Sequence, residues 1–171
     1  MAICYRSSET DAKEALEELR AHGQPAHLDL TASMAALLAG TPEQVGGVHL
    51  GLYTATKHAV LGYGESLRGE LAPEGIGVSV LCPGMVASNL AATSLRNRPE
   101  RHGGPVTTPD GPAMPGAMTP ETLGPIVVAG IRGDRLHILT HPESRPLLDT
   151  RHATLVADVE FAAASAPPGP G

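Results

Sequence analysis

The 171-residue sequence contains no tryptophan, one phenylalanine and three tyrosines, so large aromatic side chains contribute little to its core. A core of Ala, Leu and Val packs without the large apolar area that an aromatic anchor buries. Cysteine is equally scarce, and neither Cys4 nor Cys82 has the CxxC spacing of a zinc site. We therefore expect both thiols to be buried and reduced, as in a cytoplasmic protein.

Long apolar runs and clustered positive charge are also lacking. No apolar run approaches the ~18 residues of a transmembrane helix, and the N-terminus has no signal-peptide pattern. A net charge of -6 and a pI near 5.7 argue against nonspecific binding to nucleic acid or to anionic membranes. The sequence therefore predicts a cytoplasmic protein whose partners are small molecules or proteins, with no nucleic acid and no membrane.

Apolar periodicity predicts an α/β fold with a parallel sheet. The run 76–82 is rich in valine and bounded by glycine and proline, which is typical of a strand buried on both faces. Further strands are predicted over 2–5, 26–30 and 136–139, and helices over 12–19, 31–38, 53–71, 119–131 and 143–161. Residues 91–118 are too long for an ordinary connection and are predicted to be a loop that is either a functional lid or disordered. We expect one domain over 1–161 and a disordered tail over 162–171, where Ala, Pro and Gly dominate.

Tyr53 and Lys57 stand four residues apart on a predicted helix, so their side chains project from one face a single turn apart. An ammonium group beside a phenol stabilises the phenolate. Bringing the pKa of a tyrosine from about 10 to near 7 requires roughly 4 kcal/mol, whereas a lysine about 5 Å away supplies under about 1 kcal/mol in water. The pair therefore needs a pocket, preferably with a second positive charge such as an oxidised nicotinamide ring.

The residues around this pair carry a family resemblance. The sequence reads YTATKHAVLG over 53–62, ESLR over 65–68 and GIGVSVLCPGMV over 75–86. A YxxxK pair alone is common by chance, but this longer string resembles the short-chain dehydrogenase/reductase family. The match is continuous over 51–90 and looser over 119–142.

The resemblance implies a Rossmann-like, doubly wound parallel sheet and an oxidoreductase that interconverts a carbonyl and an alcohol with NAD(P). It implies that Tyr53 is the general acid/base and that Lys57 binds the nicotinamide ribose. The other residues that it assigns to the cofactor are Arg6, Ser7, Asp29, Pro83, Gly84, Val86 and Ser88. A basic residue at Arg6, beside the adenosine ribose, favours NADP(H) over NAD(H), and Asp29 is expected to contact the adenine.

Several family features have no counterpart in the sequence. No glycine-rich motif precedes Ala2 to hold a pyrophosphate, and the only asparagines, at 89 and 97, do not form the family's Asn-Ala-Gly motif. The family places a catalytic serine about 13 residues before its tyrosine, where this chain has Gly40. Thr41 is the nearest hydroxyl to that position. Losing one donor to a substrate carbonyl costs on the order of 100- to 1000-fold in rate.

The expected sheet is truncated as well. The family's strands are ordered 3-2-1-4-5-6-7. The resemblance implies that this chain keeps strands 2, 3, 6 and 7, without the first βα unit and the central strands. The remaining strands would have unpaired edges unless they pair with each other or with another chain.

Two hypotheses on function stay open at this point. One is an active oxidoreductase, completed by homo-oligomerisation through the Tyr53 helix. The other is a non-catalytic remnant of the family, acting as a regulatory or interaction protein or having no function. A metal site is not predicted, because His137 and His141, although four residues apart, fall on a strand and a turn rather than on one helix.

Overall fold

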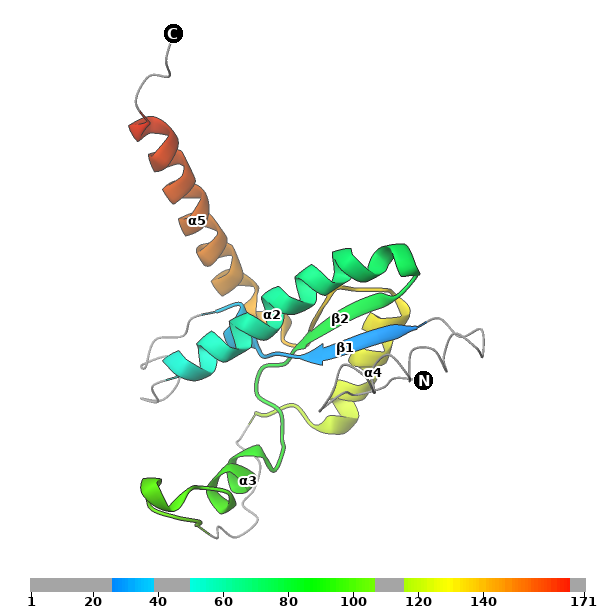
Figure 1. Cartoon of the computed structure of the whole chain (residues 1–171), viewed down its shortest axis with the longest axis vertical. Helices are drawn as coiled ribbons and strands as arrows, with labels where there is room; N and C mark the ends of the chain where they lie inside the picture. Colours follow the sequence, from blue (N-terminus) through cyan, green and yellow to red (C-terminus); the bar gives the residue numbers. More distant parts are fainter. Residues whose placement is uncertain (1–25, 39–49, 107–115, 167–171) are drawn as a thin grey trace.

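The computed structural model describes residues 26–38, 50–106 and 116–166, and a parallel sheet lies at its centre (Figure 1). The sheet has three strands in the order β1-β2-β3, which are β1 His27–Thr31, β2 Gly77–Cys82 and β3 His137–Leu139. The α/β fold is confirmed, and these strands lie within one residue of the predicted ranges. The predicted strand 2–5 and helix 12–19 lie outside the described residues.

The pairing of the strands corrects the expected sheet. β1 pairs directly with β2, from His27 opposite Gly77 to Thr31 opposite Leu81, and β2 pairs with β3. Of the alternatives left open for the unpaired edges, the structure thus shows that the remaining strands pair with each other. In the family's strand order the fifth strand lies next to the sixth, so β1 occupies the place of the fifth strand and not that of the third.

Helices cover both faces of the sheet, as the doubly wound fold requires (Figure 1). On one face is α2 Gly51–Leu71, where Gly64 packs against Val80, and on the other is α4 Pro120–Arg132, where Gly130 packs against Ile138. The buried core under α2 consists of Ala32, Met34, Ala36, Leu61, Val80 and Cys82. This core uses small and aliphatic side chains, as the shortage of aromatic residues led us to expect.

Two helix boundaries follow from local chemistry. Thr119 caps α4, because its side-chain oxygen accepts a hydrogen bond from the Thr122 N–H, and the helix runs on through Pro125. At the far end of α2, the 3-10 turn η2 Ala72–Glu74 leads into Gly75. Gly75 has a φ of 72°, a left-handed conformation that favours glycine.

The segment predicted to be a loop over 91–118 is partly helical, which corrects the prediction. It contains α3 Leu90–Arg96 and the 3-10 turn η3 Glu100–His102. The α3 sequence LAATSLR has no proline or glycine, and its leucines, alanines and arginine are good helix formers. The prediction gave too much weight to the proline and glycine residues that follow it.

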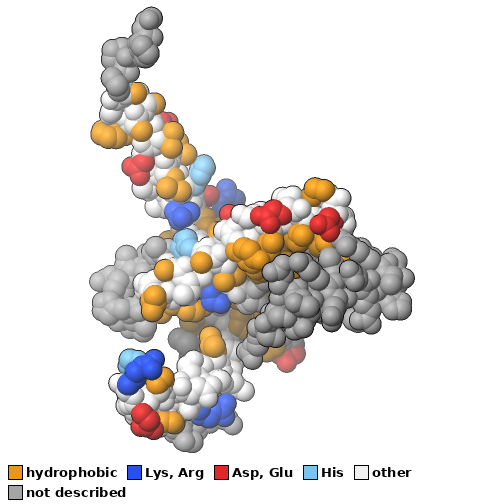
Figure 2. All heavy atoms as spheres, viewed as in Figure 1, with side chains coloured by type: hydrophobic (Ala, Val, Ile, Leu, Met, Phe, Trp, Pro, Cys, Tyr) orange, Lys and Arg blue, Asp and Glu red, His pale blue; other side chains and the backbone are white. Residues whose placement is uncertain are grey.

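The predicted helix over 143–161 is present, as the 3-10 turn η4 Pro142–Ser144 followed by the helix α5 Arg145–Ser165. None of the α5 residues is buried, and the helix projects away from the sheet (Figure 1). Its exposed apolar side chains are spread along its length (Figure 2). The helix extends through Ser165, past the predicted domain boundary at residue 161, and residues 167–171 lie outside the described part.

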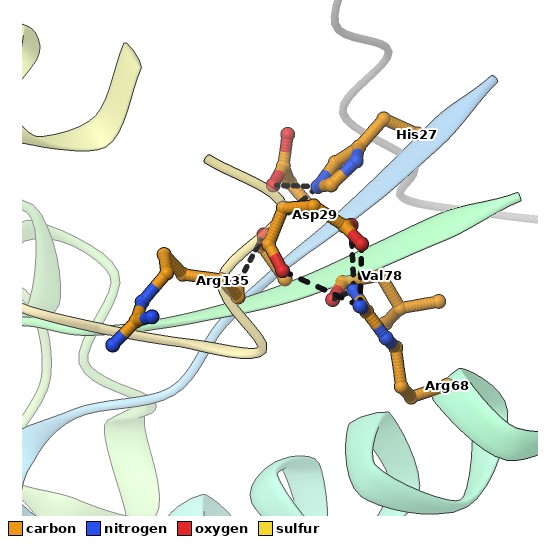
Figure 3. Close-up of polar contacts among 7 residues, drawn as sticks. His27, Asp29, Arg68, Val78 and Arg135 are labelled. Atoms are coloured by element: carbon orange, nitrogen blue, oxygen red, sulfur yellow. Dashed lines mark hydrogen bonds and ion pairs between the residues drawn. The ribbon is translucent and has the colours of Figure 1, made fainter. Parts of the chain in front are cut away.

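An ion pair fixes the turn that leads into β3. Arg68 of α2 donates two hydrogen bonds to the Asp134 carboxylate, at 2.7 and 2.6 Å, and a third to the Val78 carbonyl at 3.1 Å (Figure 3). These hydrogen bonds lower the pKa of the Asp134 carboxyl. Asp134 has a φ of 48°, a left-handed conformation that aspartate tolerates better than most residues.

The glycines of α2 provide a matched test of this packing. A Cβ at Gly64 would overlap the Val80 side chain, whereas a Cβ at Gly62 would meet nothing within 4 Å. We expect Gly64→Ala to lower the free energy of unfolding by about 1 to 2 kcal/mol, since overpacking outweighs the gain in helix propensity. Gly62→Ala should raise it by roughly 0.5 to 1 kcal/mol. Urea denaturation measures both, and equal effects would contradict the packing of α2 on β2.

Candidate active site

The candidate site lies where the carboxyl ends of the strands meet. After β1 the chain stays extended beside the end of β2, because the Ala32 N–H donates to the Leu81 carbonyl and the Met34 N–H donates to the Pro83 carbonyl. The segments after both strands are thus held side by side. In parallel α/β sheets this edge is where ligands bind.

Helix α2 brings Tyr53 and Lys57 to this edge. The Lys57 Nζ donates to the Thr31 carbonyl at 3.2 Å and lies 5.7 Å from the centroid of the Tyr53 ring. That separation is within the ~6 Å range of a cation–π contact. The Tyr53 side chain is on the surface, with 38% of the residue exposed. The predicted juxtaposition of phenol and ammonium is present, and the end of β1 fixes the ammonium.

Ser33 reaches the same edge, and the sequence analysis missed it. It follows Ala32 directly after β1 and caps the 3-10 turn η1 Met34–Ala36, which packs against α2. The Ser33 Oγ accepts from the Ala35 N–H at 3.2 Å, which leaves its O–H as a donor. The predicted helix over 31–38 is therefore wrong, because hydrogen bonds to β2 keep the chain extended as far as Ser33.

A different signal would have found this serine. Counting about 13 residues back from Tyr53 leads to Gly40, whereas counting forward from the end of the strand leads to Ser33. The distance along the chain varies with the connection between strand and helix, which here includes residues 39–49, outside the described part. The end of a buried strand is the better reference point because the sheet fixes it in space.

The predicted cofactor residues after β2 form a loop that is held from two sides. The Gly84 N–H donates to the His141 Nδ1 at 3.1 Å. Val86 forms a bridge with Met118, in which the Met118 N–H donates to the Met85 carbonyl at 2.9 Å. Ser88 lies further along and accepts from the Leu90 N–H at 3.4 Å. Pro83 and Gly84 are thus at the edge with Lys57, while Ser88 contacts the start of α3.

Asp29 is the one remaining predicted cofactor residue that the structure describes, and it is not brought to this edge. Arg6 and Ser7 lie outside the described residues. Asp29 lies in the middle of β1, opposite Ser79, with its Oδ1 3.6 Å from the His27 Nε2 (Figure 3). Burial raises the pKa of the Asp29 carboxyl, and the nearby His27 opposes this shift. Asp29 therefore lies within the strand rather than at the edge where the cofactor is expected.

Ser79, His27 and Asp29 resemble a nucleophilic triad by composition but not by geometry. The Ser79 Oγ donates to the Arg135 carbonyl at 2.7 Å, and its oxygen lies 2.8 Å from the His27 Nε2 (Figure 3). The serine is fully buried, and serine and aspartate both lie near the same imidazole nitrogen rather than on opposite nitrogens. This cluster joins β1, β2 and the turn before β3, and its role is structural.

The two histidines considered for a metal site have separate partners. The His137 Nε2 lies 3.0 Å from the Glu65 Oε1, whereas His141 contacts Gly84. Over the described ranges, no three His, Cys, Asp or Glu side chains are grouped as metal ligands. In the same ranges, no helix combines the length and the apolar character needed to cross a bilayer.

Known proteins support the assignment that the fold suggests. The family model of short chain dehydrogenases matches residues 38–99. The chain is 31% identical over 134 residues to 1-deoxy-11-beta-hydroxypentalenate dehydrogenase of Streptomyces exfoliatus, covering 78% of this chain and 42% of the relative. This chain thus spans less than half the length of that relative.

Solved structures agree in fold. A structure from Novosphingobium aromaticivorans, assigned to the short-chain dehydrogenases, is 29% identical with a TM-score of 0.60, covering 93% of this chain and 44% of that one. A short-chain dehydrogenase/reductase from Burkholderia phymatum in complex with NAD is 24% identical with a TM-score of 0.62, covering 95% and 59%. A third, from Sphingobium yanoikuyae with NADPH, is 18% identical with a TM-score of 0.51, covering 94% and 53%.

The chain belongs to the short-chain dehydrogenase/reductase family. By homology, this is a family of oxidoreductases that act on CH–OH groups with NAD(P). Its structural neighbours include complexes with NAD and with NADPH, so the likeness in fold indicates no preference between the two.

Cys82, at the end of β2, provides a test of how well this end of the strand is shielded from solvent. The residue is fully buried, and burial raises the pKa of its thiol to about 11. Because the thiolate is the reactive form, we expect the thiol to resist a water-soluble thiol reagent at pH 8 in the folded chain and to react on denaturation. A Cys4→Ser background isolates the signal of Cys82. Rapid labelling of Cys82 in the folded protein would show that the thiol is accessible to solvent and would contradict its burial.

Proposed function

We propose that this chain interconverts a carbonyl and an alcohol with a nicotinamide cofactor, using Tyr53 and Lys57. The observation that carries the proposal is the position of the Lys57 Nζ, fixed by the Thr31 carbonyl and next to the Tyr53 ring. A phenol, an ammonium group and the ends of two parallel strands come together there. This is the set of groups that a proton transfer beside a bound cofactor requires.

The residues present suit the nicotinamide end of the cofactor. Lys57 offers a cation, Ser33 offers a hydroxyl donor, and Pro83 and Gly84 offer backbone at the same edge. When bound, the cofactor supplies or accepts the hydride. The chain's own part is to move a proton between the Tyr53 Oη and the substrate oxygen, while Lys57 stabilises the phenolate and Ser33 donates to the same oxygen.

The choice of cofactor rests on one residue. Arg6 would favour the 2′-phosphate of NADP(H), as the sequence analysis proposes, but it lies outside the described residues. We therefore propose NADP(H) ahead of NAD(H) on the sequence alone. Parallel titrations with NADPH and NADH decide the matter.

Association of copies through α2 also remains a proposal. Leu52, the second residue of α2, is 83% exposed, and this leaves a large apolar side chain uncovered beside Tyr53. A second copy packed along α2 would cover it. Sedimentation measures the oligomeric state directly.

A non-catalytic family member is the second candidate, and the position of the asparagines favours it. Asn89 and Asn97 stand at the two ends of α3, away from the strands of the sheet. Neither is placed to act as the asparagine that the family resemblance leads us to expect. Such a protein would keep the fold and lack turnover.

Removing the phenol separates the two candidates. We expect Tyr53→Phe to lower cofactor-linked turnover of a panel of aldehydes and ketones by about 100- to 10,000-fold, because the general acid is lost. Lys57→Ala should lower turnover and also weaken cofactor binding. Tyr63→Phe, on an exposed part of the same helix, is the matched control and should behave as wild type. Turnover that survives both substitutions unchanged would refute the assigned roles.

A second test distinguishes Ser33 from Thr41 as the hydroxyl that donates to the substrate oxygen. We expect Ser33→Ala to reduce kcat on the order of 100- to 1000-fold with little change in the affinity for cofactor, since a donor to the substrate oxygen is removed. Thr41→Val should retain activity. The opposite pattern would show that spacing from the tyrosine, rather than position at the strand end, locates the polarising hydroxyl.

A further inference from the structure

His141, two residues after β3, connects the end of β3 to the loop after β2. The Gly84 N–H donates to the His141 Nδ1 at 3.1 Å, and the His141 Nε2 lies 3.3 Å from the Met85 carbonyl oxygen. One imidazole ring thus contacts two consecutive residues of the loop. The Ser144 side chain and N–H both donate to the His141 carbonyl, which fixes the backbone of the histidine.

The partners of the ring determine its protonation. A backbone N–H can only donate, so the Nδ1 facing Gly84 carries no proton. A carbonyl can only accept, so the Nε2 facing Met85 carries the proton. The buried Thr140 hydroxyl lies 2.7 Å from the same Nδ1. The contacts therefore fit the neutral imidazole with its proton on Nε2.

The loop is also shaped around the ring. A Cβ at Gly84 would lie 2.7 to 2.8 Å from three atoms of the imidazole, so the close approach requires glycine at this position. On its other side, the Met85 carbonyl accepts from the Met118 N–H. The Gly84 N–H and the Met85 carbonyl, which flank the peptide between these residues, are thus held by His141 and by the segment before α4.

We propose that His141 is a positioning residue for the nicotinamide end of the cofactor, acting through the Gly84–Met85 backbone. This inference rests on the proposed function, because it assumes that the loop lines a cofactor. His141 fixes where the loop lies relative to Lys57 and Ser33, and it does not touch the substrate. Its loss should weaken cofactor binding through a less ordered loop.

The test compares three variants of the full chain. His141→Phe keeps a ring and removes both nitrogens, His141→Asn restores an acceptor near the position of Nδ1, and His152→Phe on the exposed helix α5 is the matched control. Two readouts are measured: amide hydrogen exchange at Gly84 without cofactor, and the affinities for NADPH and NADH by titration. The first readout does not depend on cofactor binding.

We expect His141→Phe to accelerate exchange at Gly84 and to weaken cofactor affinity roughly 10-fold, the effect of losing about one hydrogen bond. His141→Asn should recover both properties in part, and His152→Phe should match wild type. Unchanged exchange at Gly84 in His141→Phe would overturn the inference. So would faster exchange with unchanged affinity, because the loop would then have no effect on the cofactor.

A failure of the proposed function gives a different result. If the wild-type chain binds neither NADPH nor NADH while Gly84 exchange still depends on His141, the contact is structural only and both proposals fall. If the wild-type chain binds cofactor and the His141 variants have the same Gly84 exchange and cofactor affinity as His152→Phe, the proposed function stands. This inference alone is then wrong.

Discussion

The direct parallel pairing of β1 with β2 is the constraint on which the rest of the structure depends. It satisfies the backbone groups of both strands along their shared edge and brings their carboxyl ends together. Lys57 then finds a fixed acceptor in the Thr31 carbonyl. Without this pairing, nothing would fix the end of β1 and the Pro83–Gly84 loop in position relative to each other.

Packing of helices on both faces stabilises that pairing. Val80 is fully buried between its neighbours, and the close approach of α2 depends on Gly64. Small residues at the contact compensate for the shortage of aromatic side chains, because they allow helix and sheet to come close together. The same contact determines where along the sheet Tyr53 and Lys57 are presented.

Much of this could be predicted from residues whose local pattern is strong. The valine-rich run 76–82 and the apolar face of the helix after Tyr53 correspond to β2 and α2, and the four-residue spacing correctly placed Lys57 beside Tyr53. The sequence failed where position in space is set by pairing across the sheet. The residues of a five-residue strand such as β1 do not indicate which strands it pairs with. Its place in the sheet was therefore predicted wrongly, and Ser33 was missed.

Contacts between distant segments were equally hidden. Nothing in the pattern around His141 indicates that its ring meets Gly84, because 57 residues separate the two and only the β2–β3 pairing brings them together. The prediction of a loop over 91–118 failed on a local signal. It relied on the proline and glycine content of the whole segment, although the residues of α3 are good helix formers. Local preference and sheet pairing each decide a different part of this structure.

The paired strand ends are proposed to form a site for a nicotinamide cofactor. Thermal unfolding of the purified chain at increasing NADPH concentration tests it most directly, because a ligand that binds only the folded state raises the unfolding midpoint. The account predicts one cooperative transition whose midpoint rises with NADPH concentration, with a smaller rise for Lys57→Ala. A midpoint that does not move with NADPH or NADH would contradict it.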